Sequence, residues 1–151
     1  MDIRLNNWNN VVLVGDTVLS FVLRKSIKVP IEFYIYGLSK KDTMNRIKEL
    51  LDELKTIYGF FLIVIKDDRI ECISENKCII IYISINDTIN SILESIKIDC
   101  RCTAFNGKNI YTNERFDNAI KNRENNLYDK ISTEDFIRMI KYRKFGIKMK
   151  T

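Results

Sequence analysis

The feature of this sequence that most constrains its fold is one amphipathic helix pattern followed directly by three short apolar runs. The helix pattern begins at Ser39, where Asp42 completes a capping-box arrangement, and ends at Gly59. Apolar residues recur between these points at helical spacing: Met44, Ile47, Leu50, Leu51, Leu54 and Ile57. The three runs predict strands over residues 60–65, 70–74 and 78–85. A long helix beside a strand meander indicates a chain that mixes helices and sheet.

Weaker patterns on either side predict further elements of both kinds. Residues 11–14 predict a buried strand that Gly15 ends, and helical spacing of apolar residues predicts a short helix after it. Pro30 opens a predicted strand over residues 31–36, since proline is tolerated at the start of a strand. Downstream, the Asn106-Gly107 pair predicts a hairpin between strands at residues 100–105 and 109–111. Helices are predicted over residues 88–96, 114–121 and 133–144.

Length and composition indicate a single folded domain. The chain has 151 residues, of which 46% are hydrophobic and 30% charged, with five glycines and one proline. Such a chain can build one core of ordinary size, so we expect a single domain over residues 1–151. Together with the predicted elements, this indicates the α+β class, with a mixed β-sheet and flanking helices.

Several kinds of site and location are disfavoured by what the sequence lacks. It has no histidine, which excludes histidine-dependent triads, histidine-ligated zinc and histidine general bases. The spacing of the four cysteines fits no common zinc pattern, and we expect small buried hydrophobes on strands: Cys72, Cys78, Cys100 and Cys102. The start shows no secretory signal, and no apolar run is long enough to cross a bilayer. We therefore expect a protein that is neither secreted nor inserted in a membrane.

Two segments near the start resemble the nucleotidyltransferase superfamily. A hydrophobic strand ends in the turn Gly15-Asp16-Thr17, a helix follows, and Pro30 opens a strand that carries Glu32. In that superfamily a Gly-[Gly/Ser] turn at the helix N-terminus holds the phosphates of a nucleotide with backbone N–H groups. Two aspartates on the next strand and a third acid on a neighbouring strand hold two magnesium ions. The resemblance implies this fold and, where the pattern is complete, nucleotidyl transfer.

A narrower resemblance covers nearly the whole chain and concerns domains attached to ankyrin repeats in large DNA viruses and some eukaryotes. Its recurrent pieces occur here in the same order: residues 10–15, 33–38, 99–102 followed by 106–108, and 138–144. This chain carries no repeat array and is rich in isoleucine, asparagine and lysine. By this resemblance it is identified as a stand-alone viral domain, similar to small early proteins of poxviruses.

The functional positions of that family are only partly kept. Pro30 stands at the first metal-binding aspartate and has no ligand atom on its side chain, while Glu32 stands at the second. Asp16 stands where a small neutral residue meets phosphate, and it would repel a triphosphate by about 1 kcal/mol in water and about 4 kcal/mol at an effective dielectric constant near 20. Asp99 stands at an acidic position, and Gly15 is kept. Because two-metal chemistry needs its full ligand set, the resemblance implies a degenerate site.

Each of the three acids also has an interpretation that involves no ligand. Asp16 fits a helix N-cap, a role that contributes about 1 kcal/mol. Glu32 fits a solvent-facing position on a half-buried strand. Asp99 could pair with Lys97 or Arg101 on the same strand face. We favour these interpretations for all three residues, because structural acids outnumber catalytic ones.

Positive charge gathers at the end of the sequence. The net charge is +5, and residues 138–150 include six basic residues and no acid. These cations could contact the phosphates of nucleic acid or an acidic partner: Arg138, Lys141, Arg143, Lys144, Lys148 and Lys150. The favoured interpretation is a solvated helix face whose Phe136, Ile140 and Phe145 dock on the sheet. Tyr142 and Phe145 should then be mostly buried.

These features lead us to expect a binding protein on a nucleotidyltransferase-like scaffold that performs no chemistry and needs no cofactor. Its partner would be a host or viral protein, in the host cell cytoplasm or the nucleus. One alternative is a divergent nucleotidyltransferase that uses Asp16, Glu32 and Asp99 with magnesium. Another is an accessory factor that binds nucleic acid through its basic end.

Overall fold

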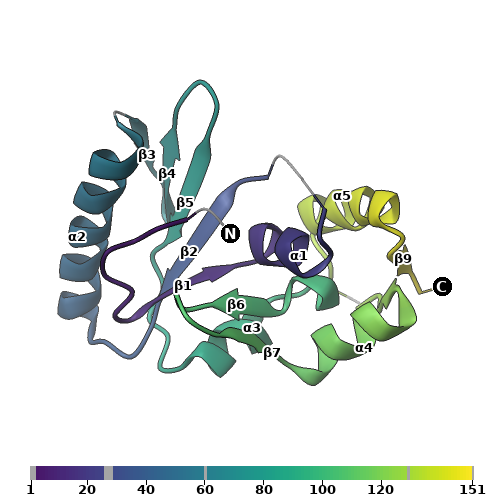
Figure 1. Ribbon diagram of the computed structural model, residues 1–151. Helices are drawn as coiled ribbons and strands as arrows, with labels where there is room; N and C mark the ends of the chain where they lie inside the picture. The colour runs from purple at the N-terminus through teal and green to yellow at the C-terminus, as the bar shows by residue number, and fades with distance from the viewer. Residues whose placement is uncertain (1–2, 26–28, 60, 129, 151) are drawn as a thin grey trace.

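The computed structural model describes residues 3–25, 29–59, 61–128 and 130–150, and its centre is a seven-stranded sheet (Figure 1). The strand order is β3-β4-β5-β2-β1-β6-β7. These strands are β1 (Val11–Val14), β2 (Ile31–Ile35), β3 (Leu62–Ile65), β4 (Arg69–Ile73), β5 (Cys78–Tyr82), β6 (Thr103–Phe105) and β7 (Ile110–Thr112). β2 and β5 pair in parallel, and the other neighbours pair antiparallel. The expected mixed sheet of an α+β protein is confirmed.

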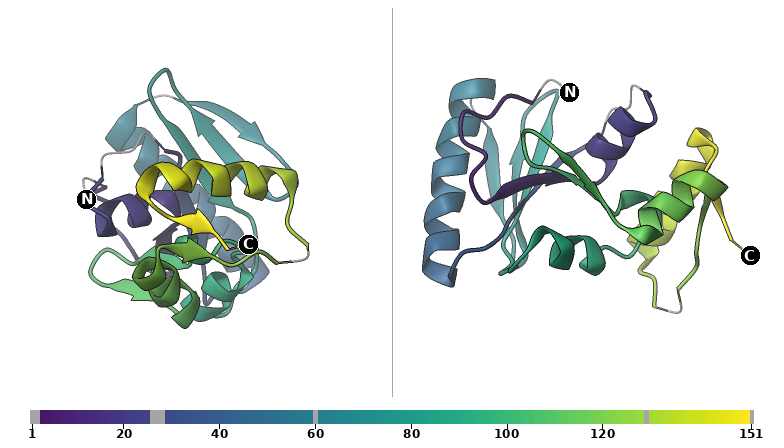
Figure 2. Two further views of the ribbon diagram at one scale, coloured as in Figure 1. Left: turned by 90° about the vertical axis from the view of Figure 1, so that its right-hand side faces the viewer. Right: turned by 60° about the horizontal axis from the view of Figure 1, so that its bottom comes forward.

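Helices cover both faces of the sheet, and others lie beyond one end of it (Figure 2). They are α1 (Asp16–Val22), α2 (Lys40–Tyr58), α3 (Ile89–Ser95), α4 (Glu114–Asn122) and α5 (Thr133–Tyr142), with short 3-10 turns η1 (Asp99–Arg101) and η2 (Arg143–Phe145). A two-stranded sheet of β8 (Glu124–Asn125) and β9 (Lys148–Met149) joins the C-terminal segments. Within the described ranges, no helix combines the length and the hydropathy needed to cross a membrane.

The long helix α2 follows its sequence pattern closely. Ser39 is its N-cap and accepts a hydrogen bond from the Asp42 backbone N–H at 3.2 Å, which satisfies one unpaired donor of the first turn. Ile47, Leu50 and Leu54 are buried and form one core with the inner residues of the sheet. α2 therefore covers the face of the sheet opposite the one that meets α3.

The central strand β1 is apolar throughout because both of its faces are covered. Val11 and Leu13 belong to the core beneath α2. Val12 and Val14 pack instead with Ile92 and Leu93 of α3 and neighbouring side chains. A continuous apolar run is the expected sequence of a strand buried on both faces.

A second core joins α1, α4 and α5 to the segment before β6. Its buried members are Leu19, Ile98, Cys100, Cys102, Phe116, Ala119, Met139, Tyr142 and Ile147. Cys72, Cys100 and Cys102 are buried, Cys78 is half-buried, and all four are free thiols. Burial raises the pKa of Cys100 to about 12 and that of Cys102 to about 11, so these thiols stay protonated at neutral pH. The expected burial is confirmed for Cys72, Cys100 and Cys102, but the expected strand position is wrong for Cys100 and Cys102, which lie in and just after η1.

The segment over residues 100–105 differs from its prediction. It begins as the 3-10 turn η1, and only residues 103–105 form a strand. The Asn106-Gly107 hairpin is present, but its loop spans residues 106–109, so β7 begins at Ile110. The strand predicted over residues 60–65 is β3, which begins at Leu62. Phe60 lies outside the described residues.

Candidate functional site

The turn between β1 and α1 is closely covered by charged side chains. Gly15 is the N-cap of α1 and has a positive φ of 74°, a conformation that favours glycine. A Cβ at Gly15 would lie 2.7 Å from Glu32 Oε2 and 2.8 Å from Arg101 Nη2. The space beside this turn, where the resemblance implies nucleotide phosphates, is therefore occupied by Glu32 and Arg101.

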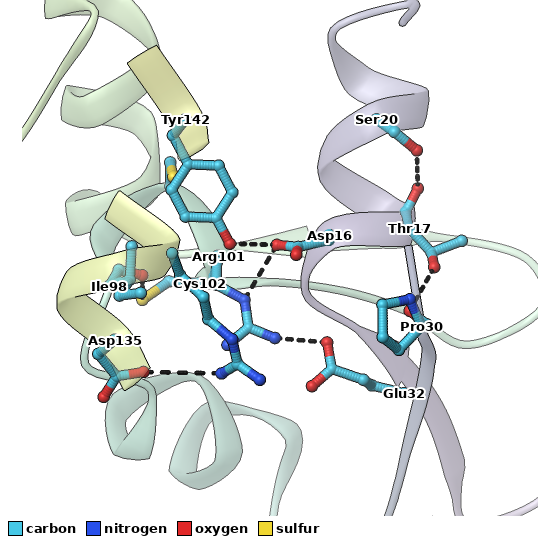
Figure 3. A network of polar contacts seen from close by, with 12 residues as sticks. Asp16, Thr17, Ser20, Pro30, Glu32, Ile98, Arg101, Cys102, Asp135 and Tyr142 are labelled. Atoms are coloured by element: carbon cyan, nitrogen blue, oxygen red, sulfur yellow. Dashed lines mark hydrogen bonds and ion pairs between the residues drawn. The ribbon is translucent and has the colours of Figure 1, made fainter. Parts of the chain in front are cut away.

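Arg101 lies between two carboxylates from different elements (Figure 3). Its Nε donates to Asp16 Oδ1 at 3.1 Å, and its Nη2 donates to Glu32 Oε2. All three residues are buried. Burial alone would lower the pKa of Arg101, but the charges of Glu32 and Asp16 raise it well above its ordinary value. A permanent cation is thus held between the two acids.

Two tyrosines complete the hydrogen bonds of this charged group, and a third stacks on one of them. Tyr82 donates to Glu32 Oε1 at 2.6 Å. Tyr142 of α5 donates to Asp16 Oδ1, as Figure 3 shows. Tyr34 stacks on Tyr82 with ring centroids 4.3 Å apart. Burial, followed by the charge of Glu32, raises the pKa of Tyr34 to about 12 and that of Tyr82 further. The tyrosines therefore remain neutral, and Tyr82 and Tyr142 act as hydrogen-bond donors.

Asp99 belongs to a separate group of contacts. It is only 1% exposed, and its Oδ1 accepts from Arg115 Nε and from the Tyr128 hydroxyl, both at 2.8 Å. Its Oδ2 accepts from the backbone N–H of Asn126 at 2.9 Å. The expected pairing of Asp99 with Lys97 or Arg101 is wrong, because η1 turns the two charged side chains of this segment to different partners.

The interpretations of Asp16 and Glu32 as an N-cap and a solvent-facing acid are also wrong. Asp16 lies inside the first turn of α1, with Gly15 as the cap, and its carboxylate faces Arg101 and Tyr142. Glu32 is buried because Arg101 and Tyr82 satisfy both of its carboxylate oxygens. A buried carboxylate with such partners avoids most of the cost of leaving water.

The residues at these positions do not fit the two-metal arrangement that the resemblance implies. Asp16 and Glu32 are brought together, but on a guanidinium, and Asp99 is held by Arg115. Pro30 offers only its backbone, whose carbonyl accepts from Thr17 Oγ1 at 3.2 Å. In the described part of the chain, no group of three or more acidic, cysteine or histidine side chains could hold a metal ion.

The basic residues of the C-terminal segment are exposed, with the exception of Arg138. Arg138 is half-buried and pairs with Glu134 at 3.1 Å and Asp135 at 3.6 Å on its own helix. The other candidate contact residues are exposed on α5, η2 and β9: Lys141, Arg143, Lys144 and Lys148. Tyr142 is buried as predicted, and Phe145 is half-buried.

The predicted docking of the α5 aromatic and aliphatic residues is wrong in part. Phe136 is 42% exposed and Ile140 46% exposed, and Ile137 beside them is 61% exposed. Met139 and Tyr142, on the opposite side of the helix, make the buried contacts instead. The helix is apolar on two faces, so periodicity alone could not indicate which face turns inward.

Sequence reasoning missed the central role of Arg101 and the two tyrosines that donate to the carboxylates on either side of it. Arg101 lies between Cys100 and Cys102, two small residues predicted to be buried. A charged residue in such a segment needs a buried counter-charge, and this signal could have pointed to Arg101. Tyr82 and Tyr142 gave no comparable signal, since their partners lie far away in the sequence.

Comparisons with known proteins bear on the fold. No protein-family model and no curated protein sequence matches the chain. Among solved structures, the Thermotoga maritima CCA-adding enzyme complexed with tRNA is 15% identical, with a TM-score of 0.62, over 93% of this chain and 35% of that one. A tRNA nucleotidyltransferase complexed with a primer tRNA and an incoming ATP analog is 13% identical, with a TM-score of 0.61, over 93% of this chain and 43% of that one. The chain has a nucleotidyltransferase-like fold.

A third solved structure shares the fold, and all three enzymes are longer than this chain. The Bacillus stearothermophilus CCA-adding enzyme in complex with CTP is 14% identical, with a TM-score of 0.58, and again the match covers 93% of this chain. The nucleotidyltransferase-like chain spans less than half the length of each of these three enzymes. At this level of identity the likeness establishes the fold. It does not show the viral or ankyrin-associated origin that the sequence resemblance implies.

One expectation requires correction in view of these likenesses. We expected a protein that performs no chemistry, yet the proteins that share the nucleotidyltransferase-like fold over 93% of this chain are CCA-adding and tRNA nucleotidyltransferase enzymes. These likenesses contradict that expectation and point to an enzyme fold.

Proposed function

We propose that this nucleotidyltransferase-like domain serves as an interaction module that binds an acidic amphipathic segment of a protein partner through α5 and the basic residues after it. The observation that carries the proposal is the outward apolar face of α5. This role uses the outward face of α5, whereas the inward Tyr142 of the same helix contacts the group of Asp16, Glu32 and Arg101.

The outward face of α5 has the composition of a contact surface. Phe136 and Ile140 are four residues apart and Ile137 and Ile140 three apart, so the three side chains share one side of the helix. They are exposed, whereas Met139 and Tyr142 on the opposite side of α5 make its buried contacts. Clustered exposed apolar side chains with a polar rim are typical of interaction sites.

The charges beside this face favour an acidic partner. Lys141 follows Ile137 by four residues and continues the apolar stripe toward the end of α5, and Lys144 lies just beyond that end in η2. Both are exposed, as is Arg143 next to them. An amphipathic helix with apolar residues on one side and acids at its margin would match both features.

The first test measures the binding of synthetic amphipathic helical peptides that share one apolar face and carry an acidic, a neutral or a basic polar face. We expect the acidic peptide to bind best, with a Kd on the order of 10 µM by fluorescence anisotropy. Substitution of Phe136, Ile137 and Ile140 together by serine should weaken binding at least roughly tenfold. Reversal of charge at Lys141 and Lys144 should shift the preference toward the basic peptide.

A matched control comes from exposed apolar residues elsewhere. Leu62 and Ile65 are exposed on the edge strand β3, and their replacement by serine should leave peptide binding unchanged. The proposal fails if the α5 variant binds like the wild type, or if none of the peptides binds. Binding of RNA with a steep salt dependence that ignores the apolar substitutions would instead assign the surface to nucleic acid.

Nucleotidyl transfer onto nucleic acid is a second candidate. It is supported by the solved structures of similar fold, which include CCA-adding enzymes with tRNA or with CTP. Under this candidate, the wild-type protein incorporates labelled CTP or ATP into RNA, and Glu32→Ala abolishes the incorporation. Absence of incorporation by the wild type with either magnesium or manganese would remove this candidate.

The proposal also includes the place where the protein meets its partner. The sequence resemblance to domains of large DNA viruses supports a viral protein that meets a host or viral partner in the host cell cytoplasm, or in the nucleus.

A further inference from the structure

A pocket of about 490 Å³ lies beside Arg115 and Tyr128, the two side chains that hold Asp99. Its lining residues are Glu94, Ile96, Lys97, Arg115, Tyr128 and Lys130. They come from the end of α3, the loop after it, the start of α4 and the segment between β8 and α5. We propose that this pocket binds a nucleoside monophosphate unit, with the phosphate at its cations and the planar base on Tyr128.

The guanidinium of Arg115 is held in place before any ligand arrives. Its Nε donates to Asp99 Oδ1 at 2.8 Å, and its Nη1 donates to the carbonyl oxygen of Ile96 at 2.7 Å. Asp99 is itself fixed by the Tyr128 hydroxyl and the Asn126 backbone. These bonds hold the plane of the guanidinium at the wall of the pocket, and a planar fork with fixed orientation suits the oxygens of a phosphate.

The charge of the pocket selects an anion. Lys97 and Lys130 are exposed at its margin and join Arg115, while Glu94 is the acid among the lining residues. The three cations come from separate segments, and one of them, Arg115, is also paired with Asp99. Glu94 can accept a hydrogen bond from a ribose hydroxyl or from the exocyclic amine of a base.

The apolar part of the pocket fits a planar ring beside that anion. Tyr128 is partly exposed, and the guanidinium of Arg115 lies 5.2 Å from the centroid of its ring. Ile96 adds aliphatic surface, so a planar base can stack on Tyr128 and rest on Ile96. The volume lies within the range of small-molecule sites. Inorganic phosphate alone would leave this part of the pocket unused.

The proposal is tested by titration of the full chain, followed by calorimetry and by backbone amide shifts in NMR. The probes are the four common nucleoside 5′-monophosphates, inorganic phosphate, adenosine and a short 5′-phosphorylated oligonucleotide. We expect at least one monophosphate to bind with a Kd below about 1 mM, and phosphate and adenosine to bind at least roughly tenfold more weakly. The oligonucleotide distinguishes a free nucleotide from the end of a nucleic acid as the source of the unit.

Substitutions of the lining residues test whether the nucleotide binds in this pocket. Replacement of Lys97 and Lys130 together by glutamine should raise the Kd roughly tenfold while the Tm stays unchanged, since both side chains are exposed. Tyr128→Phe should keep the stacking surface and most of the affinity, whereas Tyr128→Leu should lose it. Glutamine at Lys40 and Lys41, on the exposed start of α2, is the matched control and should bind like the wild type.

Three results would overturn the assignment. They are the absence of saturable binding by every monophosphate, unchanged affinity in the double glutamine variant, and amide shifts confined to the turn at Gly15. The pocket shares no residue with the outward face of α5. Failure here therefore leaves the proposed peptide contact untouched, and the reverse holds as well.

Discussion

Replacement of Arg101 by methionine should lower the free energy of unfolding by about 3–5 kcal/mol and the Tm by on the order of 10 °C. The guanidinium is bonded to both Asp16 and Glu32 in a buried position. Without it, two carboxylates would face each other in the interior with no cation between them. Loss of one partner of a buried ion pair is costly because the remaining charges are left without compensation. Urea denaturation followed by circular dichroism measures the change.

One further variant separates the missing charge from the missing packing, and a second is a control at an exposed cation. In the triple variant with Asp16→Asn, Glu32→Gln and Arg101→Met, the buried charges are gone, so a substantial part of the stability should return. Arg143→Met removes an exposed cation and should change the Tm by no more than about 1 °C. If Arg101→Met were as stable as the wild type, the buried group would contribute nothing to the link between the sheet and α5.

Replacement of Asp99 by alanine should lower the free energy of unfolding by about 3 kcal/mol. Asp99 accepts hydrogen bonds from Arg115, Tyr128 and the Asn126 backbone, and all three donors would lose their acceptor at once. Because these donors hold the segment after β8, hydrogen exchange at the Asn126 amide should accelerate more than exchange in β1.

The control and the milder variant sharpen this prediction. Asp99→Asn keeps the shape and one carbonyl oxygen, so it should cost less than Asp99→Ala. Asp52→Ala removes an exposed acid from α2 and should change the stability by no more than about 0.5 kcal/mol. An alanine variant with wild-type stability and wild-type exchange at Asn126 would show that Asp99 does not hold this segment.

Much of the fold could be predicted because its elements depend on local rules. The pattern from Ser39 to Gly59 predicts α2 with both ends, since capping and apolar spacing act within a few residues. The run of β1 and the Asn106-Gly107 hairpin were likewise predictable. The loop of the hairpin is longer than the pair suggests, because Asn106 Oδ1 accepts from the backbone N–H groups of Lys108 and Asn109 and fixes a wider turn.

The site was predicted in its positions but not in its contacts. The resemblance drew attention to Gly15, Asp16 and Glu32, which do lie together. It also implied Asp99 as a third member, and the structure places that residue with Arg115 instead. The alternation of residues 100–105 suggested one strand face for Asp99 and Arg101, but η1 sends the two side chains to different partners.

The sequence by itself determined which segments become helices and strands, the α+β class and the sharp turn at Gly15, since neighbouring residues decide these features. Only the tertiary structure decided where buried charges go. Arg101 meets Glu32 and Asp16 across 69 and 85 positions, and Tyr142 meets Asp16 across 126. The inward face of α5 was settled in the same way, because an apolar pattern on both sides of a helix gives no preference until a neighbour covers one of them.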